Sequence, residues 1–140
     1  MQLHNTTQYA IRILSYLTQQ EGDSVNYLLS AKEIAERLEI PYKFLTKIMG
    51  ELTKAGFVTS IRGREGGYEL KKSASEIKIS DILDVFNDPL HEEQCILGIG
   101  FCNKVNKCAL HDQWMQPKTL IEQMFKETTL EQIANQGTKV

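Results

Sequence analysis

The sequence predicts a mostly helical fold with a small β wing, arranged as a winged helix-turn-helix followed by a C-terminal dimerisation helix. The first observation behind this prediction is a pair of short amphipathic segments, at residues 30–38 and 41–56, separated by only a few residues. The second is a turn rich in glycine and arginine that follows them between two alternating segments. Two helices joined by a short turn form a helix-turn-helix, and a hairpin placed directly after it makes a wing.

The first helix is expected at residues 6–19, where apolar residues recur at intervals of three and four and so share one face. Thr6 or Thr7 is the expected N-terminal cap of this helix. Residues 21–29 begin with turn-forming residues and end with apolar ones. They are expected to form a loop with at most one short strand.

The helix-turn-helix is expected to start at a capping box, in which Ser30 and Glu33 each satisfy a free backbone N–H of the other. Ile40 and Pro41 should interrupt this helix, because the residue before a proline avoids helical torsions. Pro41 suits the first position of the next helix, and Gly56 is expected to end it in a left-handed cap. The predicted buried stripe of this second helix is Leu45, Ile48, Leu52 and Ala55.

The wing is expected from residues 57–61 and 68–71, which alternate as strands around the turn Arg-Gly-Arg-Glu-Gly-Gly. Arginines at the tip of a wing can enter a minor groove, whose negative potential attracts them. The charge distribution agrees with a DNA-binding surface here. The chain has a net charge of −2, yet residues 43–72 hold seven basic and three acidic residues. Basic charge concentrated in one segment favours a polyanion-binding face on that part of the molecule.

Residues 1–140 are predicted to form a single domain. A short helix capped by Ser80 should follow the wing, and a C-terminal helix should follow the cysteines. Trp114, Ile121 and Met124 lie at helical spacing in that last helix, and so many large apolar residues near a chain end favour a homodimer. The predicted parts are a DNA-binding winged helix at 1–75, a connecting helix at 76–94, a cluster-binding loop at 95–111, and a dimerisation helix and tail at 112–140.

Three cysteines and a histidine form the pattern C-x6-C-x5-C-x2-H at Cys95, Cys102, Cys108 and His111. Thiolates and imidazole are the usual protein ligands of iron-sulfur clusters and of zinc. Glycines and asparagines between the cysteines favour an irregular loop that wraps a metal centre. Gaps of five and six residues fit a cluster better than zinc, although zinc stays open. Three cysteines so close together are poorly explained as small apolar core residues.

Several function classes are disfavoured by what the sequence lacks. It shows no Ser/His/Asp or Cys/His/Asn pattern and no phosphate-binding glycine loop, so we do not expect an enzyme. No apolar run approaches the roughly 18 residues of a membrane span, and the first residues lack the layout of a signal peptide. We therefore expect a cytoplasmic protein without a membrane partner.

Several short motifs occur in a characteristic order. They are Tyr9-Ala10, Ile40-Pro-Tyr-Lys-Phe-Leu45, Gly56-Phe-Val58, Ile61-Arg-Gly63, Gly66-Gly-Tyr68, the cysteine pattern and Thr129-Leu130. This order resembles the Rrf2 superfamily of dimeric winged-helix transcriptional regulators and is most similar to its IscR-like members. The resemblance covers nearly the whole chain. It implies a bacterial transcription factor whose cluster state changes its binding to a palindromic operator in double-stranded DNA, as a repressor or as an activator.

The resemblance also implies a ligand set and a DNA-contact set. An iron-sulfur cluster, with [2Fe-2S] favoured over [4Fe-4S], would be held by the three cysteines and His111. NsrR-like members take an acidic fourth ligand from the partner subunit, and the matching position here is Gln8. The resemblance implies DNA contacts by Lys43, Thr46, Lys47, Arg62 and Gly63. We add the nearby residues Ser30, Tyr42 and Arg64 to the expected DNA-binding set.

Two other functions remain open from the sequence. The first is a DNA-binding regulator that senses through free cysteine thiols or zinc. The second is a metal-carrying module that binds another protein through its C-terminal helix. Measured iron and sulfide content would distinguish the thiol or zinc sensor from a cluster protein. Absence of DNA binding would indicate the metal-carrying module.

Overall fold

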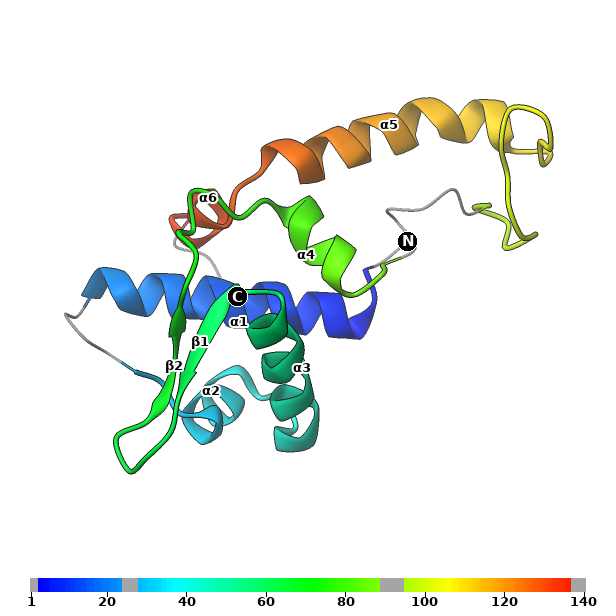
Figure 1. The fold of residues 1–140 in the computed structure, drawn as a ribbon. Helices are drawn as coiled ribbons and strands as arrows, with labels where there is room; N and C mark the ends of the chain where they lie inside the picture. Colours follow the sequence, from blue (N-terminus) through cyan, green and yellow to red (C-terminus); the bar gives the residue numbers. More distant parts are fainter. Residues whose placement is uncertain (1–2, 24–27, 89–94, 137–140) are drawn as a thin grey trace.

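The computed structural model describes residues 3–23, 28–88 and 95–136. Within these residues it contains six helices and one two-stranded antiparallel sheet, which confirms the predicted fold class (Figure 1). The elements are α1 (Asn5–Asp23), α2 (Ala31–Leu38), α3 (Tyr42–Lys54), β1 (Val58–Ile61), β2 (Gly67–Leu70), α4 (Ile79–Val85), α5 (His111–Glu127) and α6 (Leu130–Ala134).

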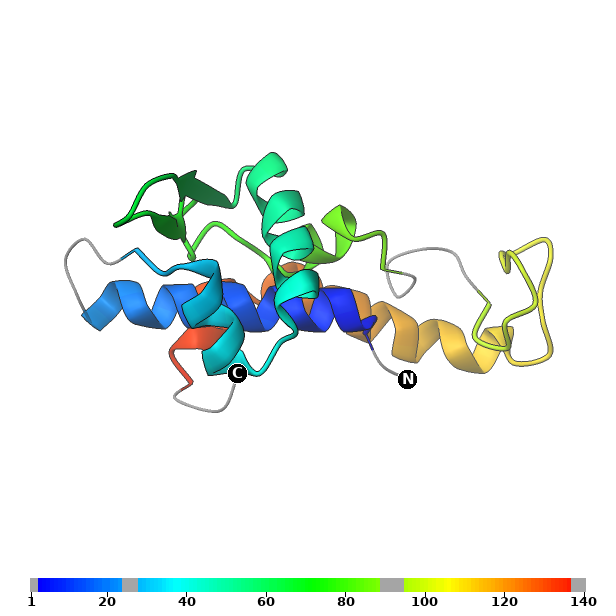
Figure 2. The same ribbon diagram turned by 90° about the horizontal axis from the view of Figure 1, so that it is seen from below.

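Helix α1 is the central scaffold, and α2, α3, α4 and α6 all pack against it (Figures 1 and 2). Its buried face carries Ala10, Ile13, Leu14 and Leu17, which belong to the hydrophobic core. The predicted threonine cap is wrong, because α1 already begins at Asn5 and Thr7 lies buried inside its first turn. The carboxylate of Asp88 instead accepts the backbone N–H of His4 at 2.9 Å. A residue that follows α4 therefore caps the scaffold helix.

The capping box of α2 is confirmed. The Ser30 hydroxyl accepts the N–H of Glu33 at 3.1 Å, and the Glu33 carboxylate accepts the N–H of Ser30 at 2.9 Å. The helix ends at Leu38, before Ile40 and Pro41, where Glu39 adopts a left-handed conformation with φ 55°. Pro41 then precedes α3 as its N-cap and is not its first residue. The turn between the two helices is thus only three residues long.

Helix α3 packs on the core through Leu45, Ile48, Met49 and Leu52. Three of these are the predicted residues, whereas Ala55 is exposed, because it lies beyond the last turn as the C-cap. Gly56 is left-handed with φ 83°, as predicted. The N–H of Phe57 donates to the Leu52 carbonyl at 3.0 Å, which is the hydrogen bond of a glycine-terminated helix.

The wing is an antiparallel hairpin that projects from the body beside α2 and α3 (Figure 1). Its register pairs Val58 with Leu70 and Ile61 with Gly67. The short strand allowed at residues 21–29 is reduced, among the described residues, to one bridge between Leu29 and Tyr68. Gly67 permits this bridge, since a Cβ there would lie 2.6 Å from the Leu29 carbonyl oxygen.

Helix α4 begins at Ile79 and not with Ser80 as its cap, because Ser80 is buried inside the first turn. The Asp81 carboxylate instead accepts the N–H of Lys78 at 2.9 Å. Of the predicted connecting segment 76–94, residues 89–94 lie outside the described residues, as do residues 137–140 of the predicted tail.

Helix α5 leads from the cysteine segment back to the body, and α6 packs against α1 (Figures 1 and 2). Phe125 is buried near the inner end of α5, whereas Leu120 and Met124 are 60% and 52% exposed. Much of the apolar surface of α5 is therefore free of contacts within the described chain.

Candidate cysteine centre and DNA-binding face

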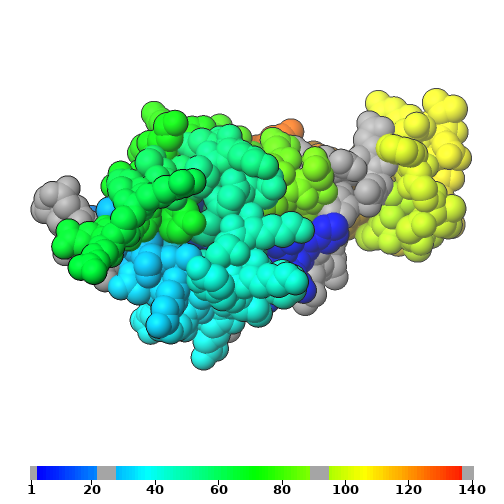
Figure 3. All heavy atoms as spheres, turned by 60° about the horizontal axis from the view of Figure 1, so that its bottom comes forward, coloured from blue at the N-terminus to red at the C-terminus, as the bar shows by residue number. Residues whose placement is uncertain are grey.

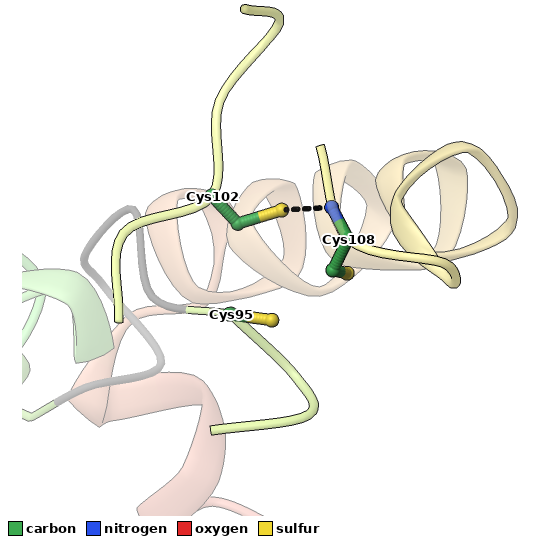
Figure 4. A group of neighbouring side chains, drawn as sticks. All are labelled: Cys95, Cys102 and Cys108. Atoms are coloured by element: carbon green, nitrogen blue, oxygen red, sulfur yellow. Dashed lines mark hydrogen bonds between the residues drawn. The ribbon is translucent and has the colours of Figure 1, made fainter. Parts of the chain in front are cut away.

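The three cysteines lie close together, although twelve residues separate the first from the last. The sulfur atoms of Cys95, Cys102 and Cys108 all lie within 4.8 Å of one another (Figure 4). Cys95 is buried, the other two are half-buried, and all three are free thiols. The structure thus brings together the three sulfur ligands that the sequence predicts.

Tight turns gather these cysteines. Gly98 and Gly100 have φ of 73° and 63°, which fold the chain back so that the N–H of Cys95 donates to the Gly100 carbonyl at 3.2 Å. The side-chain oxygen of Asn103 accepts the N–H groups of Val105 and Asn106, each at 2.9 Å. Glycine and asparagine therefore perform the role that their presence between the cysteines predicts.

His111 opens α5 and is buried beside the cysteines. Its Nδ1 lies 2.9 Å from the sulfur of Cys102, and the N–H of Cys108 approaches the same sulfur at 3.4 Å. The close group of three potential ligands in the described residues consists of the cysteines alone. His111 thus contacts one sulfur of this group through a hydrogen bond.

The pKa values of Cys95 and Cys108 are shifted in opposite directions, by backbone N–H groups at Cys95 and by burial at Cys108. The N–H of Ile99 lowers the pKa of Cys95, burial opposes it, and the N–H of Leu97 adds to the lowering. Burial raises the pKa of Cys108. N–H groups directed at a sulfur favour the thiolate, which is the form that binds metals. Three close sulfurs with such donors fit an iron-sulfur cluster or a zinc ion.

The rim of the cysteine centre is apolar and exposed. Phe101 and Val105 are 72% and 96% exposed, and Ile96, Leu97 and Ile99 lie on the same segment with at least two-fifths of their surface exposed. Gln8 lies on α1, where its side-chain N–H donates to the Leu3 carbonyl at 2.7 Å. Gln8 stands at the position that matches the acidic ligand of NsrR-like members, and its neutral amide departs from that pattern.

The predicted DNA contacts lie on another face. Figure 3 shows α2, α3 and the wing side by side on one surface, with the cysteine segment at the far end of the molecule. Tyr42, Lys43 and Lys47 of α3 are exposed, as are the three wing-tip residues Arg62, Gly63 and Arg64. Thr46 is half-buried and its hydroxyl donates to the Lys43 carbonyl at 3.1 Å.

Ser30 is half-buried, and its hydroxyl accepts the N–H of Glu33 in the cap of α2. Phe44, which sequence reasoning did not select, is 56% exposed near the start of α3. With residues of α1 and α4 it lines a pocket of about 380 Å³. The sequence does contain a signal for Phe44, because this large aromatic residue lies outside the predicted buried stripe of its helix. A residue on that side of the helix is expected to be exposed.

No helix in the described part of the chain is long and apolar enough to cross a membrane.

Comparisons with known proteins agree with the winged-helix geometry. The model of the Rrf2 family, described as an iron-dependent transcriptional regulator, matches residues 3–136. An HTH-type transcriptional regulator of Aquifex aeolicus is 36% identical over 133 residues, covering 94% of this chain and 90% of its own length. The regulator NsrR of Halalkalibacterium halodurans is 36% identical over 111 residues, covering 79% of this chain and 70% of its own.

Two solved structures share the fold. CymR of B. subtilis, the global cysteine regulator, superposes with a TM-score of 0.78 at 23% identity, covering 99% of each chain. IscR of T. potens superposes with a TM-score of 0.73 at 25% identity, covering 99% of this chain and 89% of its own. These relatives are transcriptional regulators and not enzymes, which agrees with the prediction from the sequence. The chain belongs to the Rrf2 family of transcriptional regulators.

Proposed function

We propose that this regulator is a cytoplasmic, dimeric repressor that holds an iron-sulfur cluster, with [2Fe-2S] favoured over [4Fe-4S]. The cluster ligands would be Cys95, Cys102 and Cys108, with His111 as the fourth. The observation that carries the proposal is the convergence of the three sulfurs within 4.8 Å in a family described as iron-dependent. We assign residues 1–75 to DNA binding, 76–94 to the connection, 95–111 to the cluster and 112–140 to dimerisation.

The donor set supports a cluster over a lone zinc ion. Structural zinc sites usually take cysteines in pairs two to four residues apart, whereas the gaps here are six and five residues. The N–H groups that approach Cys95 and Cys102 would stabilise sulfurs that carry negative charge. A bound cluster supplies iron that can change its redox state or exchange a ligand. NsrR and IscR are among the relatives of this chain.

His111 is the favoured fourth ligand because it is buried next to Cys102 at the first turn of α5. Its backbone N–H also donates to the Cys108 carbonyl at 3.2 Å, which ties the start of α5 to the last cysteine. The alternative fourth ligand is Gln8 of a partner subunit, which would offer a neutral amide oxygen. Imidazole is the stronger ligand for iron.

DNA binding is assigned to α3 and the wing. Helix α3 would enter the major groove with Tyr42, Lys43, Thr46 and Lys47, and Ser30 would face the backbone at the start of α2. Arg62, Gly63 and Arg64 would reach the minor groove from the wing tip. All but Ser30 and Thr46 of these residues are exposed in the structure.

A homodimer would cover the apolar side of α5 and place two DNA-binding faces on a palindromic operator. Leu120 and Met124 are more than half exposed on this helix. Apolar surface of this kind on a long helix is typical of a symmetric interface, and two-fold proteins match two-fold operators.

The cysteine segment lies between α4 and α5, so holding a cluster would fix the start of α5 relative to the body. A ligand changes a conformational equilibrium only by its differential affinity for the two conformations. The cluster would therefore regulate DNA binding if it favours one placement of α5 in the dimer.

Anaerobic purification followed by iron, sulfide and zinc analysis tests the proposal. We expect iron and acid-labile sulfide in equal amounts, with visible absorbance, and loss of both in the Cys95→Ala, Cys102→Ala and Cys108→Ala variants. Val105→Ala is a suitable control, because Val105 belongs to the same segment and is 96% exposed. Colourless protein with one zinc per chain would contradict the cluster.

A second candidate is a thiol sensor without metal. The observation that favours it is the presence of three free thiols within 4.8 Å, close enough for two of them to pair after modest movement. In that case metal-free protein would bind DNA, and mild oxidation would change its affinity reversibly.

A further inference from the structure

We infer that Gly50 is the point at which α3 approaches the DNA most closely, with Lys43, Lys47 and Lys54 placed around it to contact phosphates. This inference rests on the proposed DNA-binding face. It adds a position that must stay without a side chain.

Nothing inside the protein requires a glycine at this position. Gly50 lies within α3, and a Cβ built on it would have no atom within 4 Å, apart from its chain neighbours and the helix's own backbone. It is exposed, and it does not have the positive φ seen at Gly56 and Gly63. A glycine inside a helix costs about 1 kcal/mol relative to alanine. The glycine therefore weakens the helix with no return in packing or in backbone conformation.

The position of Gly50 on the helix indicates what lies outside. The core face of α3 is formed by Leu45, Ile48, Met49 and Leu52. At 100° per residue, Gly50 lies on the opposite side of the helix from the centre of that face. Lys43, Lys47 and Lys54 lie seven residues before it, three before it and four after it, so they share this side. All three lysines are exposed.

The lysines are available to a polyanion. Among the described residues, none of the ion pairs involves Lys43, Lys47 or Lys54. We call these three lysines with Gly50 the crest of α3. The crest is thus a row of unpaired positive charges with a gap in the side chains at its third member.

The dimensions of DNA explain why such a gap matters. The major groove is about 12 Å wide, and a helix with its side chains is about 10–12 Å across, so a helix fits with little clearance. A side chain at the middle of the crest would hold the helix axis away from the base edges. Thr46 on the neighbouring turn would then lose its reach to the base edges, while the flexible side chains of Lys43, Lys47 and Lys54 could still contact phosphates.

The test compares Gly50→Ala and Gly50→Gln with Ala55→Gln. Ala55 is exposed, follows the last turn of α3 and lies off the crest, so it controls for adding a side chain of the same size. The probe is a duplex selected from a random-sequence library by the wild-type protein, with a scrambled duplex beside it. Affinity is measured by fluorescence anisotropy, and melting temperature by circular dichroism.

We expect both Gly50 variants to melt at or above the wild-type temperature, because glycine is the poorer helix former. Gly50→Gln should bind the selected duplex roughly tenfold or more weakly, with a smaller loss on the scrambled duplex. Gly50→Ala should lose less, and Ala55→Gln should bind like the wild type.

Three results would overturn the inference: wild-type affinity in Gly50→Gln, a lower melting temperature in Gly50→Ala, or an equal loss in Ala55→Gln. The Lys43→Ala and Lys47→Ala variants separate this inference from the proposed face. If they weaken binding while Gly50→Gln does not, only the role of Gly50 fails. If they leave affinity unchanged, the proposed face itself is wrong and the inference falls with it.

Discussion

The carboxylate of Asp88 accepts the backbone N–H of His4 at 2.9 Å, across 84 positions of the sequence. Asp88 is fully buried, and it lies seven residues before Cys95. Because the free N–H groups at a helix N-terminus favour a negative charge, this contact anchors the chain that leads to the cysteines on the start of α1.

We expect Asp88→Ala to lower the free energy of unfolding by about 1–2 kcal/mol, because it removes the carboxylate that accepts the part-buried N–H of His4 at the start of α1. Asp88→Asn keeps an acceptor oxygen and should lose less. Urea denaturation of both variants measures the difference. Equal stability of Asp88→Ala and the wild type would contradict the role of this cap.

Exchange of His111 tests the fourth ligand. His111→Cys should retain the cluster with a lower reduction potential and a changed visible spectrum, since histidine ligation raises the potential. His111→Ala should give protein that loses iron readily. Redox titration and iron analysis check both results. If neither variant changes them, the fourth ligand lies elsewhere, and Gln8 of the partner is the next candidate.

DNA binding should depend strongly on salt. If each subunit contacts phosphates with about four basic side chains, a dimer neutralises about eight phosphates. The logarithm of the affinity should then fall with the logarithm of the salt concentration at a slope of roughly −7. Titration of a duplex across a range of potassium chloride concentrations gives the slope. A value near zero would rule out the proposed electrostatic face.

The wing tip and the end of the wing should differ in specificity. Arg62→Ala should cost about 1–3 kcal/mol of binding free energy and relax sequence preference, because Arg62 would enter a groove. Lys71→Ala should weaken binding to all sequences by a similar factor if it contacts only phosphate. A greater sequence selectivity in the Lys71→Ala loss would mean that the wing is placed differently on the duplex.

Stability should fall as pH rises through the titration of Glu21. Loss of hydration and the neighbouring charge of Glu69 raise the pKa of Glu21 above its usual 4.5, against the lowering effect of the Leu70 N–H. The folded state then binds its proton more tightly than the unfolded state, so this contribution is complete below the unfolded pKa and is lost above the folded pKa. Glu21→Gln should therefore lose less stability than the wild type between acid and neutral pH, as measured by urea midpoints.

Features set by neighbouring residues were predictable from the sequence. The capping box of Ser30 and Glu33 and the left-handed Gly56 depend on contacts within a few residues, and both are confirmed. The cap of α1 was not predictable, because Asp88 reaches it only through the packing of α4 against α1. Glu39 ends α2 in a left-handed conformation that its residue type disfavours, and the N–H of Ile40 then donates to the Ala35 carbonyl at 3.0 Å.

The candidate site shows the same division. Spacing and residue type identified the cysteines as ligands, but the spacing alone does not specify that their sulfurs converge within 4.8 Å. That convergence depends on the turns at Gly98, Gly100 and Asn103. The sequence likewise placed lysines on α3, whereas the significance of Gly50 between them required the knowledge that no atom approaches it from inside.

The geometry of α5 has a mechanical consequence. Its 17 residues extend over about 25 Å, with the cysteines at one end and the buried Phe125 near the other. A rigid rod of this length amplifies rotation, so that a tilt of about 10° at the inner end moves the outer end by about 4 Å. Conversely, a displacement of a few ångströms at the outer end becomes only a small rotation where α5 contacts α4. The torque at that contact is the force at the outer end multiplied by the length of α5. Under the proposed function, a small force at the cysteines would therefore become a small rotation of α5 where it contacts α4.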